Sequence, residues 1–493
     1  MGRHRVAIAW LVAASLFFYG WWNPAYLGLI VGSMLFNYAV GVAILSQASK
    51  QAKLLLASGI AVNLGLLGYF KYANFFVDNL NALAGSSHTL EAIILPLAIS
   101  FFTFQQITYL VDAWRGETRE YRFLHYALFV TFFPQLIAGP IVHHREMLPQ
   151  LARDTLYRLN AGHLAVGITI FALGLFKKVV LADGIAVYAT PVFDAAEAGV
   201  TLTFFEAWGG ALAYSLQLYF DFSGYSDMAI GLARMFGVRL PLNFNSPYKA
   251  TSIIDFWRRW HITLSRFLRD YLYIPLGGSR KGEARRMVNL MITMLLGGLW
   301  HGAGWTFVLW GGLHGLYLMV NHGWRKLFSV DEPSRLRRLF GWALTMLVVV
   351  VAWVPFRAES LDGAMAVLGA MAGGNGLSLP EQLIGRLGSV EQWLIAHGAV
   401  FHGMFLNGVF PDPKSGIAGI AILVLIAALF PNTQQFMCRY RPAFETYHGE
   451  IGRLRYHWLE WRASLVWVLF ISVVLTLAIL HLTRVSEFLY FQF

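Results

Sequence analysis

The sequence predicts an all-α membrane protein with about eleven transmembrane helices, plus re-entrant and interfacial helices, around a central tunnel. Composition is the first reason: 57% of the 493 residues are apolar, only 13% are charged, and the mean hydropathy is +0.54. Such values exclude an ordinary soluble protein. The second reason is the aromatic content, because 17 Trp, 21 Tyr and 38 Phe suit aromatic belts and a packed interior. The third is the segment from Met287 to His322, which contains no Asp, Glu, Lys or Arg.

The apolar runs predict the helices in chain order. They fall near 6–22, 27–47, 54–70, 93–112, 124–142, 163–182, 204–220, 225–236, 288–300, 305–322, 340–356, 417–430 and 464–482. A straight span needs about 20 residues, so shorter runs, and the Pro- and Gly-broken run near 132–140, are expected to be re-entrant or bent. The first run could be a signal peptide. Bulky residues continue to Trp22 without a clear small-residue cleavage site, which favours an uncleaved span.

The chain is expected to form one membrane domain over residues 1–493, because no second segment with a core of its own is evident. Its parts are N-terminal helices (1–90), a core (91–356), an insertion (357–415) and C-terminal helices with a final FLYFQF tail (416–493). The insertion is rich in Gly, Ala and Leu and poor in charge. It could therefore hold amphipathic helices that lie on the membrane.

The net charge of +11 comes from basic residues that lie in short clusters between apolar runs. Cytoplasmic loops carry such clusters under the positive-inside rule, so we expect membrane lipid, and no nucleic acid, as a partner. The single cysteine, Cys438, excludes an internal disulfide and a CxxC metal site. We therefore expect no metal.

One histidine lies deep inside an uncharged segment. The nearest upstream charge to His301 is Arg286, fifteen residues away, or about 22 Å along a helix. Ionisable residues at membrane depth are costly and usually functional. Imidazole is also the base best suited to neutral pH, and burial favours its neutral form. A lone buried histidine is nevertheless more often a hydrogen-bonded core residue than a catalyst, so the residues alone leave both interpretations open.

Seven blocks carry a family resemblance. They are LPLAISFFTFQQITYLVDAWRG, FFPQLIAGPIVHHREMLPQ, DFSGYSDMAIGLARMFGVRLPLNFNSPY, DFWRRWHITLSRFLRDYLYIPLGGSRKG, NLMITMLLGGLWHGAGW, WVPFRAESLDGAM and FPNTQQFM. Together they resemble the membrane-bound O-acyltransferases, above all the bacterial branch typified by the alginate O-acetylation membrane protein. The match is strong over about 90–360 and weak over 357–415. It implies transfer of an acyl group from a thioester donor to a hydroxyl.

The resemblance also implies roles for two histidines. The deep histidine of the family corresponds to His301, and a second position, His or Asn in the family, corresponds to His261. His261 lies three residues after Arg258, which predicts a shared helical face. It could orient the acyl carbonyl, hydrogen-bond His301, or anchor a helix at the interface. We favour a supporting role in the active site, with His301 and His261 as the catalytic residues. His314 lies thirteen residues after His301; on one straight helix the two would point apart, so we expect His314 to be structural.

The basic segment 255–286 holds eight Lys or Arg. A positive-inside loop accounts for some of them. Guanidinium groups also suit the phosphates of coenzyme A, and the family's chemistry implies a cytoplasmic acyl-CoA, here acetyl-CoA as the donor substrate. The residues expected to bind it are Trp257, Arg258, Arg259, Arg266 and Arg269.

The last six residues, 488–493, resemble the FxYFxF tail of the small partner peptide in teichoic-acid D-alanylation, whose tyrosine is thought to carry the acyl group. The matching residue here is Tyr490. Its phenol, with an unperturbed pKa of about 10, is a more readily activated nucleophile and a better leaving group than an alkyl alcohol. The alternative is an aromatic terminus anchored in the headgroup region.

The acceptor is expected outside the cytoplasm. The chain has no GDSx-type block, and its resemblance implies an extracytoplasmic SGNH-type acetyltransferase or esterase that passes acetyl to hydroxyls of a polysaccharide, alginate-like or other. The expected location is the bacterial inner (cytoplasmic) membrane, multi-pass. The alternatives are an acyltransferase for a lipid or protein acceptor, a transporter, which would show inverted repeats, and a catalytically dead scaffold.

Other polar residues beside the apolar runs have weaker interpretations. Asp221 and Asp227 could form a paired-carboxylate site, but a polar network along the tunnel, or helix capping by Ser223 or Asp221, is favoured. The remaining expectations are tunnel lining for Gln105, Gln106 and Asp112, and turns for Asn243 and Asn245.

Overall fold

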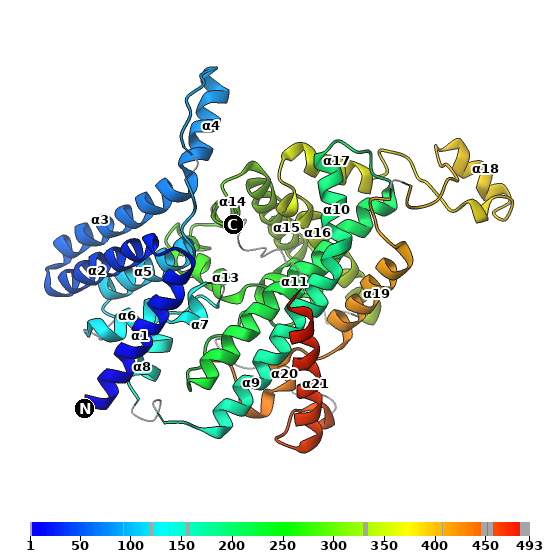
Figure 1. Ribbon diagram of the computed structural model, residues 1–493. Coiled ribbons are helices and arrows are strands. Elements are labelled where there is room, and N and C mark those ends of the chain that lie inside the picture. The colour runs from blue at the N-terminus through cyan, green and yellow to red at the C-terminus, as the bar shows by residue number, and fades with distance from the viewer. Residues whose placement is uncertain are drawn as a thin grey trace.

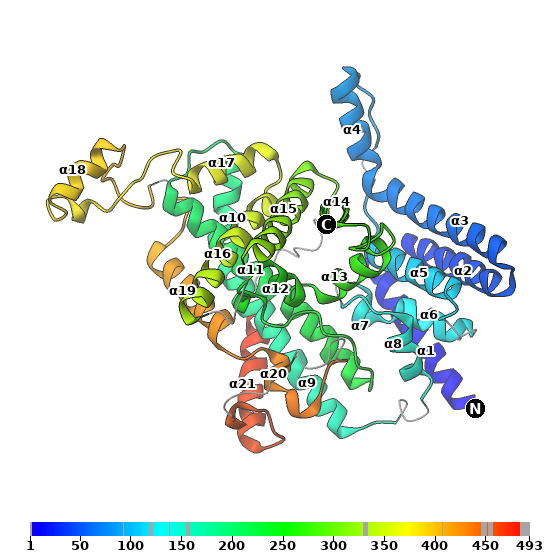
Figure 2. The ribbon, with the colours of Figure 1, turned by 180° about the vertical axis from the view of Figure 1, so that it is seen from behind.

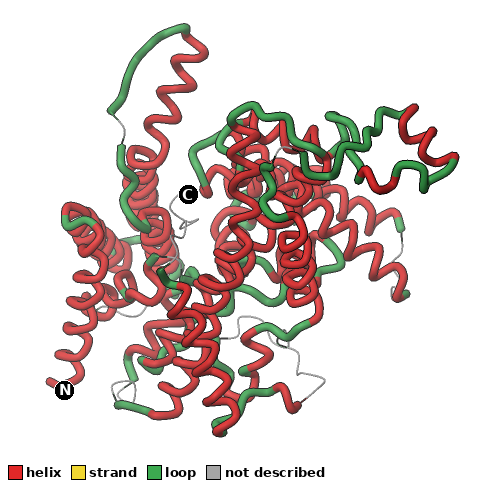
Figure 3. Tube along the Cα trace, turned by 45° about the vertical axis from the view of Figure 1, so that its right-hand side comes forward, coloured by secondary structure: helices red, strands yellow, loops and turns green. Residues whose placement is uncertain are grey.

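The computed structural model describes residues 2–91, 93–117, 122–137, 139–153, 158–328, 334–406, 408–444, 451 and 457–483. Over these residues the chain folds into helices and loops, and no β-strand forms beyond two isolated bridges (Figure 3). The expectation of an all-α fold is confirmed. Tyr490 lies outside the described residues.

The N-terminal helices form one side of the molecule, and α4 projects away from it (Figure 1). They are α1 (Gly2–Trp22), α2 (Ala25–Ser46), α3 (Ser49–Leu67), the π-helical turn η1 (Gly68–Tyr72), α4 (Ala73–Ala84), α5 (Ile99–Trp114), α6 (Phe123–Thr131), α7 (Phe133–Leu136) and α8 (His144–Leu151). The run near 124–142 is broken as expected, because α6 and α7 are short and residues 139–143 are not helical.

The remaining helices form the other side, from which the loop bearing α18 extends (Figures 1 and 2). The long ones are α9 (Ala161–Phe176), α10 (Asp183–Glu197), α11 (Phe204–Met235), α14 (Glu283–His301), α15 (Trp305–Leu327), α16 (Arg335–Arg357), α17 (Leu361–Met371), α19 (Pro413–Leu429) and α21 (Leu465–His481). The short ones are η3 (Lys177–Ala182), η4 (Pro247–Lys249), α12 (Ile253–Arg259), α13 (Ile262–Leu268), η5 (Arg269–Tyr273), η6 (Glu381–Leu383), α18 (Ser389–Ala396), α20 (Thr433–Phe436), η7 (Cys438–Tyr440) and η8 (His457–Leu459).

Among the described residues, four helical segments are long and apolar enough to cross a membrane. They are Ala25–Ser46, Ser49–Ala84, Ala161–Glu197 and Arg335–Arg357. Shorter apolar helices accompany them at Arg5–Trp21, Leu361–Met371, Pro413–Leu429 and Leu465–His481. The chain therefore has the character of a polytopic membrane protein, and the count of about eleven spans stays a prediction.

The runs at 204–220 and 225–236 form one helix, α11, of 32 residues, or about 48 Å. The polar stretch between the runs continues the helix because its carboxylates are paired: Lys178 lies 2.6 Å from Asp221, and Lys177 lies 2.6 Å from Asp227. Both lysines come from η3, on the neighbouring helix. The expectation of capping by Asp221 or Ser223 is wrong, since both residues lie in the interior of α11.

Glycines allow α9 and α11 to pack backbone against backbone. A Cβ built on Gly174 would lie 2.6 Å from the Gly224 carbonyl oxygen, and one on Gly224 would lie 2.8 Å from the Gly174 oxygen. Gly167 and Gly231 form the same reciprocal contact seven residues away, at 2.6 and 2.7 Å. Small residues at this spacing let membrane helices approach closely.

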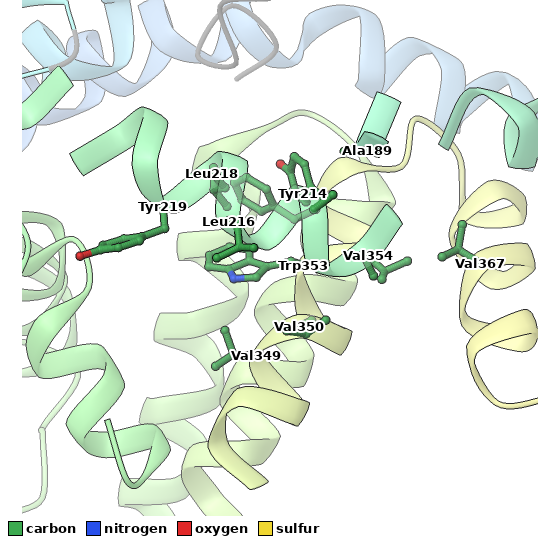
Figure 4. Packing of buried hydrophobic residues seen from close by; sticks show 14 of the residues in the cluster. Ala189, Tyr214, Leu216, Leu218, Tyr219, Val349, Val350, Trp353, Val354 and Val367 are labelled. Carbon is green, nitrogen blue, oxygen red and sulfur yellow. The ribbon is translucent and has the colours of Figure 1, made fainter. Parts of the chain in front are cut away.

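The buried apolar residues form two large clusters. One joins the N-terminal helices, and the other joins α10, α11, α16, α17 and α19, with side chains such as Tyr214, Trp353 and Val367 (Figure 4). The inner face of α17, although it lies in the 357–415 insertion, is buried in this second cluster. A third, smaller cluster of Phe104, Phe267, Trp300 and neighbours adjoins the two histidines described below.

Substituting Gly224→Ala is expected to destabilise the protein by about 1–3 kcal/mol, the usual cost of overpacking, because the new methyl group would meet the α9 backbone. Gly184→Ala in α10 is the matched control: its Cβ would have nothing within 4 Å. Thermal unfolding in detergent measures both, and a lower midpoint only for Gly224→Ala is expected. Equal midpoints would contradict the backbone contact.

Candidate functional site

A tight helical corner presents His301. This residue ends α14, and α15 begins at Trp305. The two helices touch through glycines, because a Cβ on Gly298 would collide with the Phe307 carbonyl oxygen, and one on Gly311 would collide with that of Met294. The glycine contact places the first turns of α15 directly against the end of α14. His301 therefore lies on a short, constrained corner rather than within a straight helix.

His301 is 8% exposed and is surrounded by aromatic rings. Its ring centroid lies 4.8 Å from Trp300, 5.1 Å from Trp310 and 5.2 Å from Phe356. A cavity of about 10 Å³ adjoins it, lined by Leu218, Phe222, Trp260, His301, Trp310, Trp353 and Phe356. This volume is about enough for one water molecule. A substrate therefore needs movement of these side chains to reach the imidazole.

His261 lies beside His301, with ring centroids 6.5 Å apart. It is 1% exposed and precedes α13 with a left-handed backbone, φ 42°, a conformation that costs energy in a residue other than glycine and is concentrated at functional sites. The predicted shared face with Arg258 is wrong, since α12 ends at Arg259 and the chain turns before α13. Arg258 is exposed while His261 is buried.

Asn243 sets the tautomer of His261. Its Oδ1 lies 3.1 Å from His261 Nδ1 and also accepts from the Thr263 hydroxyl at 3.0 Å and the Thr263 backbone N–H at 3.4 Å. Because that atom is an acceptor, Nδ1 carries the hydrogen and neutral His261 presents Nε2 as an acceptor. Nε2 is buried with no hydrogen-bond partner in the described part of the chain.

His314 has the opposite tautomer. The Trp257 indole N–H donates to His314 Nδ1 at 3.3 Å, so neutral His314 carries its hydrogen on Nε2. The expectation that His314 and His301 point apart assumed one straight helix. Instead they lie on two helices, and both rings pack on Trp310, at 4.9 and 5.1 Å.

Three of the five residues expected to bind coenzyme A lie on α12. Trp257 packs against Trp310, with ring centroids 5.9 Å apart. Because Trp310 also packs against His301, the Trp310 ring connects Trp257 to His301. Arg258 is exposed, and Arg259 pairs with Asp255 at 2.8 Å. The role of these residues in donor binding stays a prediction.

The other two arginines are engaged elsewhere. Arg266 is buried and forms a two-pronged ion pair with Glu146 of α8, at 2.5 and 2.9 Å. Arg269 is exposed and pairs with its neighbour Asp270 at 2.7 Å. Arg266 therefore joins α13 to α8 inside the fold, while the role of Arg269 in donor binding stays a prediction.

Two of the three residues expected to line a tunnel, Asp112 and Gln106, form buried hydrogen bonds with other helices, while the side-chain oxygen of the third, Gln105, is buried with no hydrogen-bond partner among the described residues. Asp112 accepts a hydrogen bond from the Tyr271 hydroxyl at 2.8 Å and lies 3.0 Å from His144 Nδ1. Gln106 accepts from the Tyr126 hydroxyl at 3.1 Å, which joins α5 to α6. Within the described ranges, no group of three or more His, Cys, Asp or Glu could hold a metal ion.

Comparison with known proteins assigns the family. The model of the membrane-bound O-acyltransferase family matches residues 99–354. A peptidoglycan O-acetyltransferase of Helicobacter pylori is 50% identical over an alignment of 400 positions, gaps included, which covers 75% of this chain and 74% of that protein. The probable alginate O-acetylase AlgI of Pseudomonas putida is 41% identical over an alignment of 501 positions, gaps included, which covers 98% of this chain and 94% of that protein. The chain belongs to the membrane-bound O-acyltransferase family.

More distant members of the family are also similar. The teichoic acid D-alanyltransferase of Bacillus subtilis is 29% identical over an alignment of 277 positions, gaps included, which covers 53% of this chain and 67% of that protein. Membership confirms the family resemblance and makes the chain a multi-pass membrane O-acyltransferase that uses an acyl donor. The family match spans α5 to α16 and includes both His261 and His301.

Three residues at the site escaped the sequence analysis. Asn243 was interpreted as a turn residue because prolines flank it. Its contact with His261 depends on the turn between α12 and α13, which no local sequence pattern predicts. Lys71 and Tyr72 bond the end of α14. A signal for Lys71 existed, since it is the only Asp, Glu, Lys or Arg between Lys53 and Asp78.

Asn243→Leu is expected to lower the acyltransferase kcat by about 100-fold, the lower end of the about 10²- to 10⁴-fold that a positioned general acid or base contributes. Leucine has a similar size but removes the acceptor that holds the hydrogen on His261 Nδ1. Ser226→Ala is the control, since it removes only the Asn243 amide contact at 3.2 Å. Wild-type kcat in a folded Asn243→Leu protein would show that the tautomer is unimportant.

Proposed function

We propose that the protein transfers acetyl groups from cytoplasmic acetyl-CoA to an extracytoplasmic acceptor, and that they end on hydroxyls of a polysaccharide. The observation that carries the proposal is the convergence of His261 and His301, buried and 6.5 Å apart, within the family-matched core. The printed activities of the relatives, a peptidoglycan O-acetyltransferase and alginate O-acetylases, favour acetyl as the group and a polysaccharide as the final acceptor.

In the proposed reaction His301 acts as the general base. It takes the proton from the acceptor hydroxyl, whose oxygen then attacks the thioester carbonyl carbon. The tetrahedral intermediate collapses by breaking the carbon–sulfur bond. The leaving coenzyme A thiolate takes the proton from the imidazolium, so the products are the acetyl ester and free coenzyme A with a neutral His301.

The tautomer of His261 limits which hydrogen bonds its ring can form in the reaction. Because Nε2 is an acceptor in the neutral ring, His261 cannot donate to the acyl carbonyl unless it is protonated. A ring-centroid distance of 6.5 Å to His301 is also too long for a direct hydrogen bond between ring nitrogens. We therefore assign His261 to accept a hydrogen bond from a hydroxyl or water located between the two rings, which would orient the acceptor for His301.

For the donor we propose that Trp257, Arg258, Arg259 and Arg269 contact coenzyme A on the cytoplasmic side. Trp257 connects this segment to the site through Trp310. Arg258 and Arg269 are exposed, and guanidinium groups suit phosphates. Arg266 is left out of this set because it is buried against Glu146.

For the acceptor we propose a relay. The Tyr490 phenol would receive acetyl in the reaction above, with its proton passing to His301. A serine hydroxyl of an extracytoplasmic SGNH-type protein would then attack the tyrosyl ester, forming a seryl ester and returning the phenol. A polysaccharide hydroxyl would take the acetyl group last. This path requires the protein to span the inner membrane, with the acetyl-CoA site and the partner on opposite sides.

Incubating the purified protein with isotopically labelled acetyl-CoA is expected to add one acetyl group to the peptide that contains Tyr490. Mass spectrometry locates the label, which should be absent in His301→Ala and in Tyr490→Phe. An unmodified peptide in wild-type protein that still transfers acetyl to an added hydroxyl would contradict the carrier role while leaving His301 as the base.

Arg258→Gln is expected to raise KM for acetyl-CoA by about tenfold without changing thermal stability, because an exposed guanidinium–phosphate contact is lost. Arg266→Gln should instead destabilise the fold by about 3–5 kcal/mol, since it leaves the buried Glu146 carboxylate unpaired. Steady-state kinetics and thermal unfolding separate the two effects. An unchanged KM in Arg258→Gln would remove Arg258 from the donor site.

A further inference from the structure

The helix that runs from α3 through η1 into α4 contacts the end of α14, far away in sequence. The Lys71 ammonium donates to the carbonyl oxygens of Trp300 and His301, the latter at 3.1 Å. The adjacent Tyr72 hydroxyl donates to the Leu299 carbonyl at 2.8 Å. Both side chains come from the π-helical turn η1, an irregularity that often marks functional sites within helices.

These contacts provide hydrogen-bond donors to backbone carbonyls at the end of α14 that have no partner within the helix. The last four carbonyls of an α-helix have no partner within it, and the C-terminal end carries a partial negative charge that attracts a cation. Inside a membrane protein no bulk water is present to satisfy them. Lys71 and Tyr72 cap the last three carbonyls of α14, those of Leu299, Trp300 and His301.

The same helix also holds the start of α15. The Trp305 indole N–H donates to Asn79 Oδ1 at 2.8 Å, and the Phe75 ring lies 5.9 Å from the Trp305 ring. Both ends of the corner that carries His301 are therefore attached to one helix. We call Lys71, Tyr72 and Asn79 the corner clamp.

We propose that Lys71 and Tyr72 are positioning residues for acyl transfer, which hold the terminal residue of α14 so that its imidazole reaches the acceptor hydroxyl. The proposal rests on the proposed function of His301 as the base. The polar atoms of Lys71 and Tyr72 bind backbone carbonyls of the corner, and the Lys71 ammonium also lies 5.8 Å from the centroid of the Trp300 ring. We therefore assign them a role that acts through the position of His301 and not on the substrate.

Positioning matters here because His301 is the last residue of its helix. A general base works within hydrogen-bond reach of the proton, about 2.6–3.2 Å, and a misplacement of about 1 Å can cost about 10²-fold in rate. Helix ends fray unless they are held. The adjacent cavity is small and enclosed by rings, so a shift of the corner would also change its shape.

The test compares matched substitutions on the same helix. Lys71→Met keeps the apolar stem and removes the donors and the charge, and Tyr72→Phe removes one hydroxyl. The controls are Lys53→Met, an exposed lysine of α3, and Tyr69→Phe, on the same π-helical turn but 58% exposed. Lys71→Arg tests rescue, because arginine keeps the charge and the donors.

We expect Lys71→Met to lower kcat by about 10- to 100-fold and Tyr72→Phe by less, with KM for acetyl-CoA unchanged. Lys71→Arg should recover most of the rate, and both controls should match the wild type. Hydrogen exchange by mass spectrometry gives a readout independent of activity: amides of residues 299–306 should exchange faster in Lys71→Met at an unchanged thermal midpoint.

Two results would overturn the proposal. One is wild-type kcat in Lys71→Met and Tyr72→Phe, which would show that the base does not depend on the clamp. The other is unchanged exchange at the corner, which would show that Lys71 does not hold it. If the wild-type protein transfers no acetyl group, the proposed function fails instead, and the exchange data still decide whether the clamp holds the corner.

Discussion

The structure depends on one constraint: charged and polar groups within the apolar helical core must be paired inside the protein. Lys177 and Lys178 neutralise Asp227 and Asp221, and this pairing lets α11 run through its polar stretch as one helix. The same rule applies at the end of α14, where Lys71 binds backbone carbonyls that have no partner within the helix. The paired groups lie on segments distant in sequence, so satisfying them joins the helices into one body.

The site follows from this arrangement. α14 and α15 meet through Gly298 and Gly311, and that contact leaves His301 at a corner enclosed by aromatic rings. His261 arrives from a second corner, where a left-handed backbone turns its ring inward. Asn243 then determines which nitrogen of His261 carries the hydrogen. The burial of His301, the placement of His261 and the tautomer of His261 thus come from three separate segments. Each segment is held by contacts that serve the fold as well as the proposed chemistry.

Particular residues show why some expectations were wrong. Arg258 and His261 look like neighbours on a helical face, but α12 ends between them because the chain reverses there. The Arg266 guanidinium has the chemistry of a phosphate ligand. Both of its terminal nitrogens, however, bind the carboxylate of Glu146, 120 residues away in the sequence. His314 and His301 were expected to point apart because a straight helix was assumed. The chain instead turns a corner at Gly302, and both imidazole rings pack against Trp310. In each case the expectation rested on a local property of the sequence, but a turn or a distant partner decided the outcome.

By itself, the sequence determined the all-α membrane character, the family and most helix positions, and it made His301 the candidate base, because hydropathy and motif order are local properties of the chain. The tertiary structure alone decided what surrounds those residues: the pairing of His261 with Asn243, the removal of Arg266 from the exposed basic segment, and the clamp of Lys71 and Tyr72 on the end of α14. The physical reason is that a buried polar group takes whichever complementary group packing brings near it. Packing between separate segments of the chain leaves no periodic trace in either one.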